Sequence, residues 1–245
     1  MANDGVATAG LAQPRRRGEP SAVDPFVLPA IGLGAFAVIV GARYFFAREQ
    51  RLKRRIKTLP LSSIADTPEL QDVRVTGQLA YLGDRAPLEA PLSGRPCAAW
   101  RVIVRERRGT GKNKRWVTIL EEGDSRDFAL EDESGRAIVD GTLVELALDF
   151  DRKGGTGFLS RPSPYLEGFL HERGIATRGI VFGKTLDYRE GALEAGEQVT
   201  VAGSGTWEND PTQRGKGYRD VGKLLRVGAM SDGNLLATDD PKLAR

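Results

Sequence analysis

Nucleophilic and metal-dependent chemistry would depend on two residues, since the 245-residue sequence holds one cysteine, Cys97, and one histidine, His171. A four-ligand zinc site of the Cys/His kind needs more ligands than these two. His171 falls near the end of an expected helix, where a cationic imidazole interacts favourably with the helix dipole. Cys97 opens a β-rich stretch, where a small buried thiol is usual. The sequence therefore predicts no catalytic residue, no metal ligand and no cofactor.

The densest basic feature of the later sequence is the run RRGTGKNKR at 107–115. Its Gly111-Lys112 pair superficially suggests a phosphate-binding loop. The match fails, because Glu106 stands five residues before Gly111 and Asn113 replaces the Ser or Thr that would hold magnesium. We interpret the run as a hairpin tip, either simply solvated or in contact with lipid head groups or an acidic partner. Its candidate contact residues are Arg107, Arg108, Lys112, Lys114 and Arg115.

The net charge of +3 comes from one short stretch of the chain. Residues 43–57 carry seven cations against Glu49, whereas residues 58–245 carry 26 basic and 29 acidic residues. A basic stretch beside an apolar one indicates a membrane surface and not a nucleic acid. The alternative is a solvated flank without lipid selectivity. The membrane-surface candidates are Arg43, Arg48, Arg51, Lys53, Arg54, Arg55 and Lys57.

The basic stretch follows an apolar segment that carries no charge from 25 to 42. Eighteen residues in a helix rise about 27 Å, close to the ~30 Å of a bilayer core. The apolar character resumes after Arg43 with an aromatic run, YFFA at 44–47, suited to the membrane interface. We predict a transmembrane helix at 25–47. A buried core helix and a cleaved signal peptide are the alternatives.

The flanking Lys and Arg residues indicate the orientation of this segment. Seven lie on its C-terminal side and three on its N-terminal side, and cytoplasmic flanks carry the excess of positive charge. No later apolar run approaches the length of a span. The sequence therefore predicts a single-pass membrane protein with a cytoplasmic C-terminal domain, whose partners are the lipid bilayer and an unidentified protein.

The elements that would position these residues are short strands. Glycine makes up 30 of the 245 residues, which favours tight turns over long helices. We predict a mostly β fold of the α+β kind, with two sub-sheets or partly open barrels and one short helix. The expected organisation is a disordered tail at 1–24, the span at 25–47, a basic juxtamembrane segment at 48–69, a β-rich domain at 70–235 with sub-modules at about 70–150 and 160–235, and a tail at 236–245.

Alternation of apolar and polar residues predicts the individual strands. They are expected at 73–79, 97–105, 115–120, 127–130, 136–139, 143–150, 186–189, 198–203 and 223–227. Ser163 as N-cap, Pro164 at the first helical position and Gly174 as a stop predict a helix between them. The glycine-rich segment 153–157 is expected to be a flexible connection, and 208–222 a polar loop.

One run resembles the signature of a known family. Residues 90–100, APLSGRPCAAW, are similar to the S-P-L-S-G-x-x-C-x-x-[YW] signature of the GIDE family, also called the beside-a-membrane domain. Three further pieces follow the family pattern in order: VTGQL at 75–79, FALEDESGRAIVD at 128–140 and YREGALEAGEQVTVAG at 188–203. Trp116 stands in a second strand after the signature. The resemblance covers roughly residues 26–235.

The resemblance implies a β-rich module beside a membrane. Eukaryotic members are membrane-bound E3 ubiquitin ligases, in which the domain lies between two membrane helices and a zinc-binding RING follows. A RING needs about eight Cys and His ligands, and this sequence has two such residues. We expect neither a second span nor a RING here, so ligase activity does not carry over. What carries over is a recognition or assembly role.

The leading interpretation is a single-pass, membrane-anchored GIDE-like module on the cytoplasmic face, which recognises a protein partner and has no catalysis of its own. One alternative is a ligase-type transferase subunit that works with a RING supplied in trans. Another is an anionic-lipid-sensing module that uses 107–115 together with 43–57.

Overall fold

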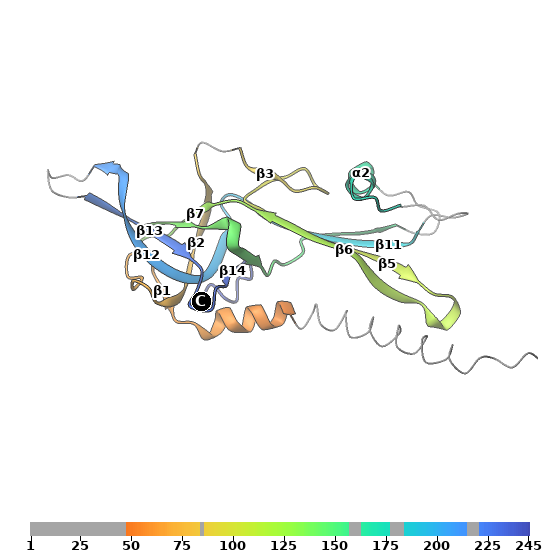
Figure 1. The fold of residues 1–245 in the computed structure, drawn as a ribbon, viewed down its shortest axis with the longest axis horizontal. Coiled ribbons are helices and arrows are strands. Elements are labelled where there is room, and N and C mark those ends of the chain that lie inside the picture. Colours follow the sequence, from red (N-terminus) through yellow and green to blue (C-terminus); the bar gives the residue numbers. More distant parts are fainter. Residues whose placement is uncertain (1–47, 84–85, 157–162, 177–183, 215–220) are drawn as a thin grey trace, which may run out of the picture. The chain divides into compact units, whose positions relative to one another are not determined.

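The computed structural model describes residues 48–83, 86–156, 163–176, 184–214 and 221–245. The predicted tail at 1–24 and the predicted span at 25–47 lie outside them. In these described ranges no helix has the length and apolar character needed to cross a bilayer. The predicted mostly β fold is confirmed there, with two helical segments, at 48–58 and at 164–172, and a barrel-like ring of strands (Figure 1).

Five strands form the ring: β2 Asp72–Tyr81, β7 Phe128–Glu131, β8 Arg136–Val139, β13 Val221–Gly228 and β12 Gln198–Arg214. They pair in that order, and β12 returns to pair with β2. The pairs are antiparallel except β8–β13. Numbered in chain order, the ring runs 1-2-3-5-4-1, which is the connectivity of the OB fold, a five-stranded Greek-key barrel. Three short strands extend this sheet: β1 Leu61–Ser62, β9 Val144–Leu146 and β14 Leu235–Thr238.

The inside of the ring is the main hydrophobic core. Strand β2 shows how the sequence makes it, since Val73, Val75 and Leu79 are buried and lie at alternate positions. Each such side chain contributes about 1.5–3 kcal/mol on burial. The cluster draws on both predicted sub-modules, with Phe128 and Leu130 from one and Val199, Val201, Leu225 and Val227 from the other. The segments 70–150 and 160–235 thus share one core.

A second, four-stranded antiparallel sheet has the order β10-β11-β5-β6. Its strands are β10 Arg152–Thr156, β11 Leu186–Leu193, β5 Ala99–Arg108 and β6 Arg115–Ser125. One face is covered by helix α2, Pro164–Glu172, and by the small hairpin of β3 Leu88–Glu89 and β4 Pro96–Cys97 (Figure 1). Trp100 meets the edge of the Phe169 ring at 6.2 Å between centroids.

The predicted short helix is confirmed with its caps. The Ser163 hydroxyl accepts a hydrogen bond from the amide of Leu166, and Pro164 occupies the first helical position. Gly174 has a φ of 68°, which allows the chain to leave the helix in the left-handed conformation. His171 lies in the last turn, as expected.

Two of the expected loops are wrong. In the expected flexible connection at 153–157, residues 153–156 belong to β10, which pairs with β11, and residue 157 lies outside the described residues. Gly154 has a packing role in this strand, since a Cβ on it would overlap the Tyr188 ring. In the expected polar loop at 208–222, residues 208–214 belong to β12 and residues 221–222 to β13, and residues 215–220 lie outside the described residues. Polar residues of this ribbon pair across its strands, as Arg226 does with Glu208 at 3.0 Å.

The expected tail at 236–245 is part of the folded domain. Strand β14 is buried along its whole length, and Leu243 is buried beyond it. Arg74 donates hydrogen bonds to the carbonyl oxygens of Leu243 and Arg245. Sequence polarity is misleading here, because the apolar run LLA at 235–237 is short and is covered from two sides. Leu235 and Ala237 lie in the core of the ring, and Leu236 packs in the cluster of Ile56 from the helix at 48–58.

Candidate functional site

The basic run 107–115 lies at the outer end of hairpin β5–β6, as the sequence predicts. The register of β11 with β5 ends at Glu106, and the Arg107 amide donates one more hydrogen bond to the carbonyl of Thr185, so among the described residues β5 and β6 extend past β11 at this end. A short 3₁₀ turn at Gly111–Asn113 connects them. Gly109 has a φ of 97°, and a Cβ there would overlap the Asn113 carbonyl. The turn thus requires glycine at this position.

We call residues 107–115 the cationic tip. All of them are exposed. Arg108 pairs with Glu106 at 2.8 Å between Nη2 and Oε2. Within the described part of the chain, Arg107, Lys112, Lys114 and Arg115 form no ion pair. The tip therefore presents four uncompensated positive charges to its surroundings.

The sheet behind the tip differs from it, because its cations are paired. On the face opposite α2, Arg101 is buried and its Nη2 lies 2.6 Å from Glu121, while its Nη1 donates to the carbonyl of Leu146. Further along, Arg105 donates two hydrogen bonds to Asp187. The unpaired positive charge of the hairpin is thus confined to its outer end.

Trp116 marks the boundary between these two regions. It lies opposite Arg107 in the hairpin, its side chain is 38% exposed, and the Arg105 guanidinium lies over its ring at 5.8 Å from the centroid. The sequence places Trp116 in a strand, and in the structure it lies in β6 with an exposed side chain. The alternation of residue types along 115–120 does not predict this exposure. The exposure depends on which residue of β5 lies opposite Trp116, and the sequence alone does not give that register.

The juxtamembrane cations lie on the helical segment 48–58, and several bind the barrel. Arg48 donates to Glu145, with a distance of 2.9 Å from its Nε. Lys53 Nζ lies 2.6 Å from Asp149 and 3.1 Å from Asp240. Arg55 pairs with Asp232. The acidic partners of these cations come from segments that are distant from the helix in sequence.

Hydrophobic contacts hold the same helix. Ile56 is fully buried, and Leu52 packs partly buried against the same cluster. The other members come from the end of the chain and from β12: Ala202, Met230, Leu236 and Leu243. This face, together with the ion pairs, fixes the helix on the folded domain.

The remaining juxtamembrane candidates have different environments. Arg54 and Lys57 are exposed and form no ion pair with the described residues. Arg51 is exposed and engaged in an interaction. Arg43 lies outside the described residues. The predicted membrane-surface residues that the structure describes thus fall into two groups. Some dock the helix on the folded domain, and the others are exposed on the outer side of the helix.

The electrostatics of the docked helix follow from partial burial. Burial opposes the charge of Lys53, but hydrogen bonds from its ammonium to Asp149 and Asp240 outweigh it and raise the pKa of Lys53. Burial raises the pKa of Asp239 to about 6, against the opposing effect of a hydrogen bond from the Asp149 amide. Asp240 has a lowered pKa, because backbone and Lys53 hydrogen bonds outweigh its burial.

The signature-like loop at 90–95 is held by a buried carboxylate. Glu190 is fully buried, and its Oε1 accepts a hydrogen bond of 2.6 Å from the amide of Leu92. Arg95 stands nearby, with one nitrogen 2.5 Å from both Asp151 and Glu194 and the other 4.0 Å from Glu190 Oε2. Glu190 belongs to the run YREG at 188–191, so two of the sequence runs that resemble the family signature meet in the fold.

The other pieces of the pattern also have structural roles. Asp132 accepts hydrogen bonds from the amides of Ser134, Gly135 and Ile64, which closes the β7–β8 turn. These bonds outweigh its burial and lower its pKa. Gly77 lies so close to the neighbouring strand that a Cβ would come within 2.8 Å of the Glu131 carbonyl oxygen.

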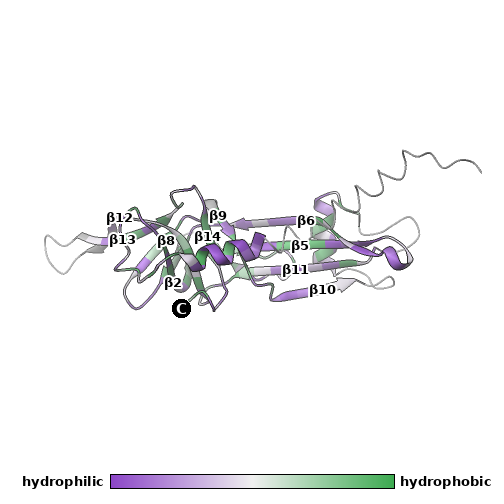
Figure 2. Ribbon diagram, turned by 90° about the horizontal axis from the view of Figure 1, so that it is seen from below, coloured by the Kyte–Doolittle hydropathy of each residue, from purple (hydrophilic) through white to green (hydrophobic). Residues whose placement is uncertain are grey.

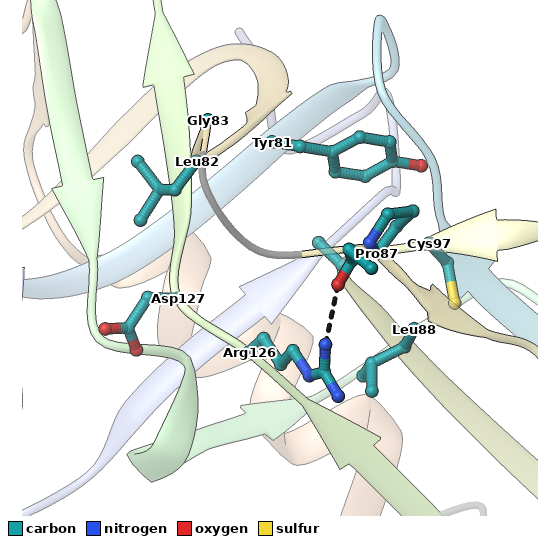
Figure 3. Close-up of a pocket in the computed structure, with 10 residues that line it drawn as sticks. Tyr81, Leu82, Gly83, Pro87, Leu88, Cys97, Arg126 and Asp127 are labelled. Atoms are coloured by element: carbon teal, nitrogen blue, oxygen red, sulfur yellow. Dashed lines mark hydrogen bonds between the residues drawn. The ribbon is translucent and has the colours of Figure 1, made fainter.

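A pocket of about 280 Å³ lies beside the signature-like loop (Figure 3). Tyr81 and Cys97 line it, and Arg126 donates to the Ala86 carbonyl at 2.6 Å. The Tyr81 hydroxyl donates to Pro96 O and accepts from the amide of Ala195. Burial, reinforced by Glu190 and Glu194, raises the pKa of the Cys97 thiol to about 12. The pocket therefore offers a protonated, inert thiol and polar groups that are already engaged.

No group of three or more potential metal ligands lies together among the described residues. Comparisons with models of protein families, with curated proteins and with solved structures found no match to this chain. The candidate sites are therefore the cationic tip, whose residues are exposed, and the helix 48–58, which is docked on the folded domain.

Proposed function

We propose that this chain is a single-pass membrane protein that displays a GIDE-like binding module at the cytoplasmic face and holds a protein partner there. The observation that carries the proposal is the docking of helix 48–58 on the barrel. This helix directly follows the predicted span at 25–47 in the sequence, so its attachment sets the distance between the module and the bilayer.

The attachment is strong enough to act as a rigid connection. Complete burial of an isoleucine such as Ile56 contributes about 1.5–3 kcal/mol. Lys53 bridges two carboxylates from separate segments, and removing one member of a shielded pair costs more than an exposed pair would. A flexible linker would need neither the buried isoleucine nor the lysine ion pairs.

A rigid connection gives the proposed role its physical basis. A partner that is bound to a module at the membrane surface is kept close to the other proteins of that surface, so their effective concentration around it is raised. Recognition needs no nucleophile or metal, which agrees with the engaged polar groups around Cys97. The ligase-type alternative would need its RING from another chain, because this sequence has one Cys and one His against the about eight ligands of a RING.

The test uses the full chain in its own membranes, with a photo-crosslinking amino acid at Tyr165. This residue is 62% exposed on α2 and can be replaced by an aromatic analogue. We expect one saturable crosslinked protein that is retained in the membrane fraction. The matched site is Glu133, on an exposed turn.

Two variants decide between recognition and chance contact. Ile56→Asp, which releases the helix, should reduce the crosslink at 165, whereas Lys57→Asp on the outward side of the same helix should not. Crosslinks of equal yield and identity at 133 and 165, or no crosslink at either site, would contradict the proposal.

A further inference from the structure

We infer that the cationic tip binds anionic phospholipid head groups, with Arg107, Lys112, Lys114 and Arg115 as the contact cations and Trp116 at the membrane interface. The inference rests on the proposed membrane anchoring. It goes beyond that proposal by giving hairpin β5–β6 a lipid ligand and by distinguishing the tip from the docked helix, three of whose cations, Arg48, Lys53 and Arg55, pair with carboxylates of the folded domain.

The first argument is the charge arrangement across the hairpin. Arg108 lies directly opposite Arg115, and Lys112 and Lys114 follow in the turn. Like charges at facing positions of a strand pair destabilise it. The strands behind the tip avoid this arrangement by pairing their arginines with Glu121 and Asp187. Behind the tip, carboxylates neutralise the positive charge of the arginines. At the tip, an anionic surface would neutralise the positive charge in the same way.

The second argument is the aromatic residue next to these charges. Trp116 is partly exposed and stands across from Arg107. Tryptophan is enriched where a membrane meets water, because one end of its side chain is apolar and the other can donate a hydrogen bond. Figure 2 shows the hydrophilic outer end of the hairpin and the more hydrophobic stretch of β5 behind it. Cations with an adjoining exposed tryptophan suit a head-group layer better than bulk water.

The third argument is the position of the first described helix. Arg48, the first described residue, lines a pocket together with Arg101 and Glu121 of the β5–β6 sheet. Ile56, at the other end of the helix, packs on the barrel. The helix therefore begins on the side of the hairpin. The tip lies seven positions beyond Arg101 on β5, about 23 Å along the strand from this pocket.

The observations favour a lipid surface over an acidic protein. The tip is a convex turn with four separate cations, which can meet a continuous anionic surface without a fixed pattern of partners. Each Lys or Arg near such a surface favours the bound state by about fivefold. The predicted span at 25–47 also supplies a bilayer to the tip permanently.

The experiment places a probe at the tip of the full-length chain, reconstituted in vesicles. Asn113→Cys introduces an exposed thiol in the turn. The native Cys97 is buried with a pKa of about 12, so a maleimide nitroxide labels position 113 selectively. Glu133→Cys, on another exposed turn, is the matched site. Oxygen accessibility of the nitroxide reports its depth in vesicles of phosphatidylcholine alone and with about one third phosphatidylserine.

The charge variants are matched as well. Lys112→Gln/Lys114→Gln removes two cations from the tip, and Arg136→Gln/Lys223→Gln removes two exposed cations from the barrel. We expect the probe at 113 to reach the head-group layer in phosphatidylserine vesicles. The tip variant should lower its bound-to-free ratio by about 30-fold, and the barrel variant should leave it unchanged. Added salt should weaken the contact.

Each remaining outcome overturns the inference. A probe at 113 that stays in water while the chain is retained in carbonate-washed vesicles refutes lipid contact and leaves the anchoring intact. Equal depth in neutral and anionic vesicles refutes head-group recognition. Immobilisation of the probe only when native membrane proteins are present assigns the tip to a protein. If carbonate extracts the chain from the vesicles, the proposed anchoring is refuted, and the inference that rests on it is refuted as well.

Discussion

Glu190 shows how single residues of the family-like pattern act. Its carboxylate holds the amide of Leu92 inside the protein, far from any solvent. Nothing in the run YREG predicts this contact, because the two residues are 98 positions apart. The sequence identifies the pieces of the pattern, and the fold shows that Glu190, Asp132 and Gly77 stabilise turns and close strand contacts.

Glu190→Ala should lower the free energy of unfolding by about 2–3 kcal/mol, since it leaves the Leu92 amide without its acceptor. The expected fall in melting temperature is about 5–10 °C for a domain of this size. Glu190→Gln, which keeps an acceptor oxygen, should cost less. Glu194→Ala, at a partly exposed position, should cost under about 1 kcal/mol. Melting of the alanine variant at the wild-type temperature would contradict this role.

The Cys97 thiol should be inert in the folded protein. Because its pKa is raised to about 12 by burial, the thiol stays protonated at pH 8, where an ordinary cysteine reacts readily. Thiol titration should therefore find no reactive group in the native chain and one group in denaturant. Rapid native labelling would contradict the pocket geometry in Figure 3.

At the scale of elements, the helix at 48–58 combines a buried apolar face with cations that match carboxylates on the barrel. The excess of acidic residues after position 57 is the one sequence signal of this pairing, and it does not identify the partners. The hairpin β5–β6 is a contrasting element, since its predicted tip is confirmed in place and four of its cations form no ion pair with the described residues.

Ile56→Ala should destabilise the docked helix by about 2–4 kcal/mol, because it removes buried methyl groups and leaves a cavity. Amide hydrogen exchange should accelerate across 48–58 and at β14, which the helix covers. Exchange in the β5–β6 pair should stay as it is. An unchanged exchange rate in the helix would show that the docking contacts are not stabilising.

Asp239 should make the stability of the folded domain pH-dependent. Its pKa is about 6 in the fold against 3.8 as a free group, so the folded state binds the proton more tightly than the unfolded state. Stability from this group therefore increases as the pH falls from about 7 to 4. Asp239→Asn should remove about 2 kcal/mol of that variation, after allowance for partial exposure. Equal pH profiles of unfolding for both proteins would refute the assignment.

At the scale of the whole molecule, local patterns predict the hairpins and α2, and long-range pairing decides the rest. Alternation in 73–79 predicts a strand but not its partner, Val201, which lies 126 positions beyond Val75. Residues 152–156 form a strand because β11 pairs with them, against their own glycine content. The ring of five strands follows from such pairings, and its OB connectivity does not by itself determine function.

The most direct test of the account is alkaline carbonate extraction of the full-length chain from its native membranes. We predict that the chain stays in the membrane pellet, because residues 25–42 carry no charge and have the length of a bilayer core. Phe36→Arg/Val38→Arg/Val40→Arg should move it to the supernatant with its domain still folded. Release of the unaltered chain by carbonate would contradict the proposed anchoring and the role built on it.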